Sequence, residues 1–112
     1  MKKEHNKLVR DKILKVLKKS GVSFSYSILD NSAKGDKEYL EKLHEKLDEE
    51  ILEFKKEPSI EELADIMEVV EALGKFYRIR MKDVMKVKKA KKEDRGGFSN
   101  RIILKWTWGD KH

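Results

Sequence analysis

Two long amphipathic patterns, separated by a short polar break, constrain this chain more than any other feature. The first covers residues 36–54 and the second residues 59–77, and Pro58 lies in the break between them. In both patterns apolar residues recur every three or four positions, which is the period of an amphipathic helix. Helices joined by so short a connection usually pack side by side in opposite directions. The sequence therefore predicts an antiparallel helical hairpin at the centre of the fold.

The remaining segments predict two more helices and two short strands. Helices are expected over residues 7–20 and 81–94, the second ending at a Gly-Gly pair. Apolar and polar residues alternate over residues 22–28 and 102–108, which is the period of a half-buried strand. We expect a mainly α protein, an antiparallel bundle of about four helices with a small two-stranded β element, in a single domain that covers residues 1–112.

The helical hairpin carries two pairs of acidic residues, Glu50 with Glu53 and Glu62 with Asp65. Each pair has i, i+3 spacing, which puts both carboxylates on one side of a helix. Glu62 falls inside the apolar arc of its helix, where an uncompensated charge is costly to desolvate. Carboxylate oxygens are the ligands that Mg²⁺ prefers, and Mn²⁺ is the alternative. The sequence therefore predicts a metal site, although a buried salt bridge from Glu62 to a Lys or Arg of another helix is the structural alternative.

Basic residues gather on both sides of this acidic region. Residues 1–20 hold eight Lys and Arg against two Asp and Glu, residues 36–71 hold five against fourteen, and residues 75–95 hold ten against three. Arg can bind two phosphate oxygens at once and Lys supplies a mobile positive charge. The residues that we expect to bind phosphate are Arg10, Lys12, Lys88, Lys92 and Arg95.

The composition narrows the compartment in which the protein works. The chain has no cysteine, which excludes disulfides and thiolate metal ligands and favours a reducing environment. No apolar run approaches the length of a membrane span, and no secretory leader follows Met1. We expect a soluble, cytoplasmic protein that does not bind membranes.

Three segments in order resemble a known family. Residues 49–53 (EEILE) and 61–65 (EELAD) are similar to the EExxE…ExxD signature of the MazG-like all-α nucleoside triphosphate pyrophosphohydrolases. Residues 7–13 (KLVRDKI) and 93–98 (EDRGGF) resemble the phosphoribosyl-ATP pyrophosphohydrolase-like subgroup. The subgroup usually has Pro after the first of these motifs, where this chain has Leu14.

This resemblance implies a Mg²⁺-dependent enzyme. In such an enzyme Glu50, Glu53, Glu62 and Asp65 would hold the metal, and a nucleoside triphosphate would be cleaved between its α and β phosphates. The products would be a nucleoside monophosphate and pyrophosphate, as in nucleotide-pool house-cleaning. Members commonly form homodimers or homotetramers. We expect Glu53 to orient or deprotonate the attacking water and Lys12 to offset the charge of the phosphates, so these two are the catalytic candidates.

Two non-enzymatic functions remain as alternatives. A basic helical domain could bind nucleic acid through residues 81–94, and its affinity would then fall steeply with salt. This alternative gives no reason for an acid on an apolar arc, so we do not expect nucleic acid as the partner. A helical interaction module is the other alternative, and it predicts that Glu62→Gln changes stability without altering any chemistry.

Overall fold

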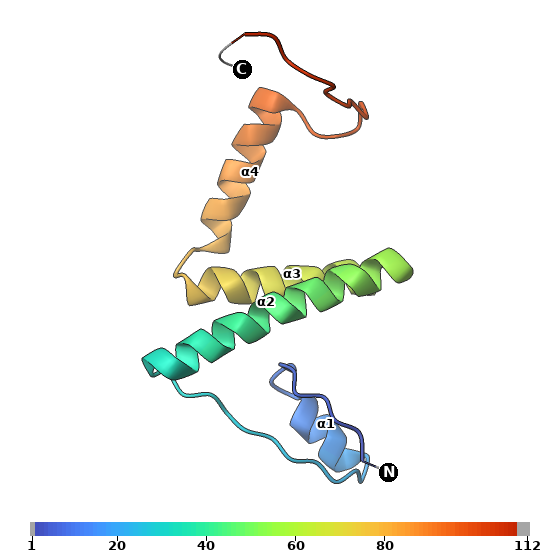
Figure 1. Ribbon diagram of the computed structural model, residues 1–112, viewed down its shortest axis with the longest axis vertical. Helices are drawn as coiled ribbons and strands as arrows, with labels where there is room; N and C mark the ends of the chain where they lie inside the picture. Colours follow the sequence, from blue (N-terminus) through green and yellow to red (C-terminus); the bar gives the residue numbers. More distant parts are fainter. Residues whose placement is uncertain (1, 110–112) are drawn as a thin grey trace. The chain divides into compact units, whose positions relative to one another are not determined.

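The computed structural model describes residues 2–109 and contains four α-helices. They are α1 (Ile13–Lys19), α2 (Ala33–Lys56), α3 (Ile60–Phe76) and α4 (Met81–Arg95), and they are labelled in Figure 1. The chain divides into two compact units, one ending at Ile79 and the other beginning at Arg80. The prediction of about four helices is confirmed and the described residues are all α, whereas a single bundle of all four helices in one domain stays a prediction.

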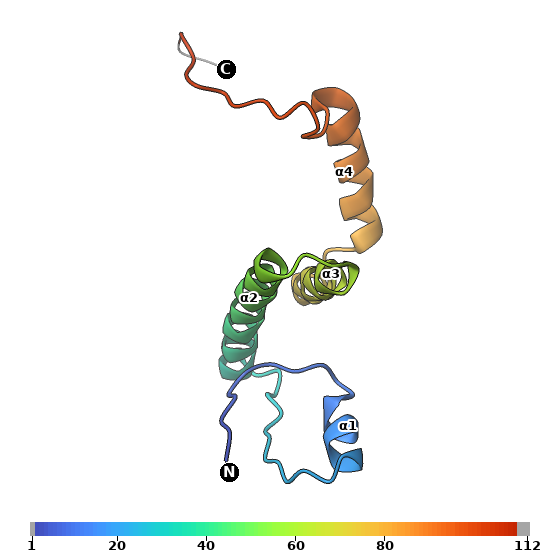
Figure 2. The same cartoon turned by 90° about the vertical axis from the view of Figure 1, so that its right-hand side faces the viewer.

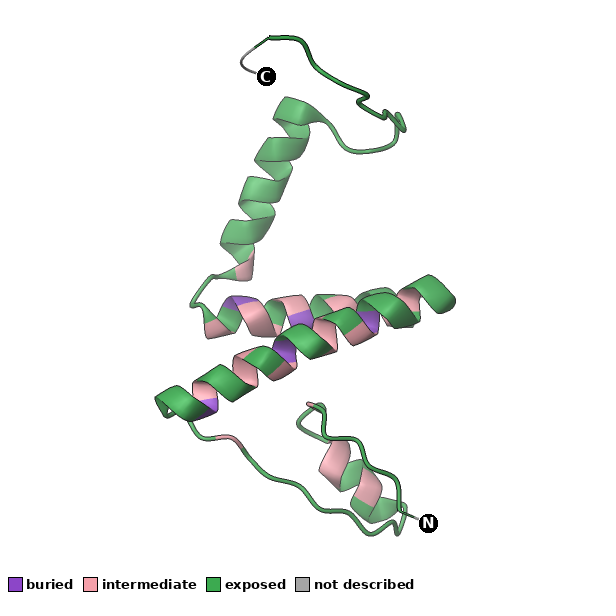
Figure 3. Cartoon of the chain, in the orientation of Figure 1, coloured by how far each residue is buried: buried purple, intermediate pink, exposed green. Residues whose placement is uncertain are grey.

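The helices α2 and α3 form the predicted hairpin. They pack side by side in opposite directions, as the two views in Figures 1 and 2 show. Leu43 on α2 is only 1% exposed, and Val69 on α3 is also buried. The buried positions in Figure 3 lie on these two helices. The hairpin therefore holds the apolar core of the first unit.

Serine side chains cap the N-terminal ends of both helices of the hairpin. Ser59 Oγ accepts a hydrogen bond of 3.1 Å from the backbone N–H of Glu62, a capping contact at the first residue of the second amphipathic pattern. Ser32 Oγ does the same for Gly35, also at 3.1 Å, and starts α2 at Ala33 rather than at the predicted residue 36. Gly35 weakens the helical pattern, which hides this start. Glycine is needed at position 35 because a Cβ at that position would clash with the carbonyl oxygen of Asp30.

The helix predicted over residues 7–20 is shorter than expected. It begins at Ile13, and residues 7–10 lie outside any helix. Lys7 and Arg10 instead form ion pairs with acids of α2 and α3. These contacts join residues 42 and 55 positions apart, so the local sequence pattern does not contain them.

The two predicted strands are wrong. Residues 2–109 contain no strand, and the segments 22–28 and 102–108 have no regular secondary structure. A helix satisfies its hydrogen bonds within one segment, whereas a strand needs a neighbouring strand. Alternation specifies which side chains share a face but supplies no such partner. The apolar side chains of both segments are exposed accordingly, up to 90% at Trp108.

The second unit contains α4, which was expected over residues 81–94 and extends to Arg95. It ends at Gly96, whose φ of +82° lies in the left-handed region that glycine adopts most easily. None of the residues of α4 is buried. Within the described part of the chain, no helix combines the length and the apolar character that crossing a membrane requires.

Candidate metal centre

Three of the four predicted metal ligands converge between α2 and α3. Glu50 comes from α2, while Glu62 and Asp65 come from α3, and each offers a carboxylate oxygen within 4.8 Å of the others. The i, i+3 spacing on α3 aligns two of these carboxylates, and the packing of the hairpin adds the third. Glu50 is only 9% exposed. This set of oxygen ligands, in a partly desolvated position, suits a hard divalent cation such as Mg²⁺ or Mn²⁺.

Glu62 is the least compensated member of the group. Its Oε2 atom is buried and has no hydrogen-bond partner among the described residues. Burial raises the pKa of Glu62, and the negative charges of Asp65 and Glu50 raise that pKa further. A buried acceptor without a donor is rare and costly in a folded protein. A cation placed among these three carboxylates would satisfy it.

The other two carboxylates already have cationic partners. Arg10 Nη2 lies 2.6 Å from Asp65 Oδ1, and Lys46 Nζ lies 3.5 Å from Glu50 Oε1. Glu62 has no ion pair within the described part of the chain. The structural alternative of a salt bridge from Glu62 to another helix is therefore not found. The two cations that contact the cluster, Arg10 and Lys46, pair with Asp65 and Glu50 and not with Glu62.

Glu53, the fourth predicted ligand, lies outside this group of three. Its side chain is exposed, although its negative charge contributes to raising the pKa of Glu62. It is therefore near the cluster without converging on it. Its roles as a metal ligand and as a catalytic residue stay predictions.

The predicted phosphate-binding residues fall into two sets. Arg10 contacts the cluster directly through Asp65, and Lys12 lies exposed at the start of α1. The second set consists of exposed residues of α4, which belongs to the other compact unit: Lys88, Lys92 and Arg95. Their role in phosphate binding stays a prediction.

Sequence reasoning missed two lysines close to the cluster. Lys46 pairs with both Glu49 and Glu50, and its i, i+4 spacing to Glu50 is a signal that could have identified it. Lys7 Nζ lies 2.8 Å from Glu49 Oε1. Lys7 and Glu49 are 42 positions apart along the chain, so no local pattern predicts that contact.

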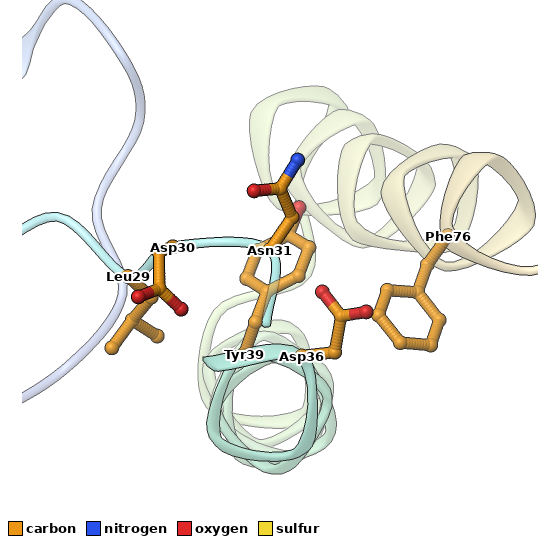
Figure 4. Close-up of a pocket in the computed structure, with 6 residues that line it drawn as sticks. All are labelled: Leu29, Asp30, Asn31, Asp36, Tyr39 and Phe76. Carbon is orange, nitrogen blue, oxygen red and sulfur yellow. The ribbon is translucent and has the colours of Figure 1, made fainter. Parts of the chain in front are cut away.

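A cavity of about 450 Å³ lies elsewhere on the first unit. Figure 4 shows the side chains that line it, which come from the end of the loop before α2, from the first turns of α2 and from the end of α3: Leu29, Asp30, Asn31, Asp36, Tyr39 and Phe76. The Tyr39 and Phe76 rings are 5.9 Å apart between centroids. At a rise of about 1.5 Å per residue, Tyr39 lies roughly 16 Å along α2 from Glu50. The cavity is therefore a feature separate from the metal centre.

The chain was compared with known proteins in three ways. No protein-family model matches it, and no match is found among the curated proteins or the solved structures. What can be inferred about function therefore depends on the geometry of the metal centre and on the motifs.

Proposed function

We propose that the protein is a Mg²⁺-dependent nucleoside triphosphate pyrophosphohydrolase, which cleaves its substrate between the α and β phosphates. The observation that carries this proposal is the buried, partnerless oxygen of Glu62, held within 4.8 Å of ligand oxygens from Glu50 and Asp65. A purely structural cluster of acids would be expected to give that oxygen a donor. A cluster that binds a cation leaves the oxygen free for the metal.

The chemistry of this group fits phosphate hydrolysis. When bound, Mg²⁺ would polarise the phosphate and lower the pKa of a nearby water. Glu53, whose negative charge acts on Glu62, is the residue that we propose to accept a proton from that water. Arg10 brings a guanidinium to the same place, where it can bind two phosphate oxygens. Lys12 is the second proposed phosphate ligand of this unit, and a role for the α4 cations Lys88, Lys92 and Arg95 stays a separate prediction.

The resemblance to the pyrophosphohydrolase motifs supports the same reaction. The two acidic motifs at residues 49–53 and 61–65 supply the three carboxylates that converge. Their position on helices is consistent with the helical metal site that the resemblance implies. The motifs and the geometry are separate observations that favour one function.

The decisive experiment is an assay of pyrophosphate release from a panel of nucleoside triphosphates, with Mg²⁺, with Mn²⁺ and with EDTA. Glu62→Gln keeps the shape of the side chain but removes a charged ligand. We expect it to lower activity about 100-fold or more, because losing even an outer partner of a metal ligand costs about 10–100-fold. Glu68→Gln makes the same change on an exposed position of α3 and should leave activity unchanged.

Two outcomes would contradict the proposal. One is a folded, metal-loaded protein that releases no pyrophosphate from any substrate. The other is a Glu62→Gln variant that remains as active as the wild type. In either case a salt titration of nucleic-acid binding would test the alternative in which the exposed cations of α4 bind a polyanion.

We also propose that the protein works as a homodimer or homotetramer. Several apolar residues of the hairpin remain exposed, including Leu63 at 50% and Met67 at 48%. These two residues are one helical turn apart on one side of α3, and exposed apolar side chains grouped in this way favour an interface. Light scattering after size-exclusion chromatography would measure the mass, and Met67→Glu should lower it. A wild type that is monomeric at assay concentrations would contradict this part of the proposal.

A further inference from the structure

The segment of residues 6–10, which we name the strap, is tied to both helices of the hairpin. Lys42 Nζ on α2 donates a hydrogen bond of 2.9 Å to the backbone carbonyl of Asn6. Lys7 pairs with Glu49, also on α2. Arg10 pairs with Asp65 on α3, and the course of the segment beside α2 can be followed in Figure 2. The guanidinium of Arg10, at the end of the strap, therefore contacts a carboxylate of the candidate metal centre.

The contact between Arg10 and Asp65 uses one of the three carboxylates of the metal centre. The side chain of Arg10 is 59% exposed and that of Asp65 is 37% exposed, and one N–O pair of 2.6 Å joins them. Ion pairs as exposed as this one are weak and can exchange partners. A divalent cation between Glu50, Glu62 and Asp65 would repel the guanidinium and compete with it for the same carboxylate.

We propose that Arg10 and the divalent cation compete for Asp65, so that binding of the metal frees Arg10 for the phosphates of the substrate and loosens the Arg10 end of the strap, while the contacts of Asn6 and Lys7 with α2 remain. This inference rests on the proposed function, because it requires a metal at the three carboxylates. Without metal, Arg10 compensates part of the negative charge of the cluster. With metal bound, the Arg10 side chain becomes available at the edge of the site, where its guanidinium could donate hydrogen bonds to two phosphate oxygens at once.

Competition of this kind is reciprocal, which makes it measurable from both sides. If metal weakens the hold of Asp65 on Arg10, removal of Arg10 must strengthen the binding of metal by the same factor. We therefore expect Arg10→Gln to bind Mg²⁺ about two- to fivefold more tightly than the wild type, the range that an exposed ion pair allows. The same variant should have a raised KM for a nucleoside triphosphate, because it has lost a phosphate ligand.

The first measurement is a calorimetric titration of Mg²⁺ into the wild type, Arg10→Gln and Lys15→Gln. Lys15→Gln removes one positive charge from an exposed position of α1 and serves as the matched control. Its Mg²⁺ affinity should equal that of the wild type. A tighter Arg10→Gln together with an unchanged Lys15→Gln would show competition at Asp65 rather than a general effect of charge.

The second measurement follows the strap in the wild type, without any substitution. A protease that cleaves after lysine should cut at Lys12, at the Arg10 end of the strap, several-fold faster when Mg²⁺ is added, whereas cleavage at Lys7, which keeps its pairing with Glu49, should change less. Cleavage at Lys105, outside every helix, provides the internal reference and should keep its rate. In Arg10→Gln the cleavage at Lys12 should be fast with or without Mg²⁺.

The outcomes separate this inference from the proposed function. If Mg²⁺ binds but neither its affinity in Arg10→Gln nor cleavage of the strap changes, the competition is refuted while the metal centre stands. If Mg²⁺ binds to no variant, both proposals fail. Weaker Mg²⁺ binding in Arg10→Gln would also overturn the inference, since Arg10 would then support the metal site instead of competing for it.

Discussion

The helices α3 and α4 have similar lengths, 17 and 15 residues, yet only α3 contributes to a convergent site. On α3 Val69 is buried against α2, and this packing brings Glu62 and Asp65 to Glu50. On α4 no residue is buried, and the basic side chains along it are exposed. The difference teaches that charged residues form a defined site where a packed apolar face fixes the helix that carries them. Regular helical structure alone is not enough.

The physical cause of the difference lies in the apolar residues. On the hairpin they form a continuous stripe, so each helix has a face that must be buried against a partner. On α4 they are few, and three of them stay exposed: Val84, Met85 and Val87. Its backbone hydrogen bonds are satisfied locally, so the helix forms without that burial. Three predictions test how far this contrast extends, from the largest expected effect to the smallest.

The largest effect should come from the core of the hairpin. Leu43→Ala removes the most deeply buried side chain and should lower the free energy of unfolding by about 2–5 kcal/mol. The matched substitution on α4 is Val87→Ala, where the exposed side chain should change stability by less than about 0.5 kcal/mol. Urea unfolding followed by circular dichroism measures both. Equal losses in the two variants would contradict the contrast between the helices.

A smaller effect is expected from the cations of α4. If Lys92 binds a substrate phosphate, Lys92→Gln should raise KM about tenfold, because a hydrogen bond to a charged group contributes about 1.5–3 kcal/mol. Its affinity for Mg²⁺ alone should not change, since the proposed ligands lie on α2 and α3. Steady-state kinetics and a Mg²⁺ titration test the two statements.

Lys89 provides the control for this prediction, because it is also exposed on α4 but does not share the helix side of Lys88, Lys92 and Arg95. Lys89→Gln should leave KM unchanged. If Lys92→Gln behaves in the same way, the cations of α4 are solvated surface and take no part in the site. The contrast between α3 and α4 would then be sharper than we propose.

The smallest effect concerns Lys7 and Glu49. The hydrogen bond to Glu49, followed by the negative charge of Glu49, raises the pKa of Lys7. The hydrogen bond from Lys7 is the main cause that lowers the pKa of Glu49. Because the pKa of Glu49 is lowered in the folded state, Glu49 stabilises the fold above the unfolded pKa of about 4.3. This stabilisation is lost as the pH falls through the folded pKa. A raised lysine pKa stabilises the fold below about 10.4 and is lost as the pH rises through the folded value.

The contribution of this pair should therefore be largest between about pH 5 and pH 10 and should vanish at both extremes. Solvent screens the pair, so Lys7→Gln should cost less than about 1 kcal/mol at pH 7. Unfolding curves of the wild type and Lys7→Gln at pH 3 and pH 7 give the comparison. A difference in stability that is as large at pH 3 as at pH 7 would show that the ion pair is not its origin.

Much of the fold could be predicted because the residues that specify a helix lie close together in the sequence. The apolar period located α2 and α3 to within a few residues, the Gly-Gly pair marked the end of α4, and the Ser59 cap agrees with the start of α3. The errors occurred where local pattern and long-range contact disagree. Residues 7–10 lie outside any helix and pair with acids of the hairpin, and the alternating segments 22–28 and 102–108 are not strands.

The sequence by itself determined the helical class, the two acidic pairs and the position of Glu62 on an apolar arc, since all three follow from spacing along one helix. Only the tertiary structure decided that Glu50 joins Glu62 and Asp65 while Glu53 stays outside. It also decided that Arg10, 55 residues from Asp65 along the chain, is that residue's partner. The reason is that helical periodicity fixes the direction of side chains within a segment. Distances between segments depend on how the apolar faces pack.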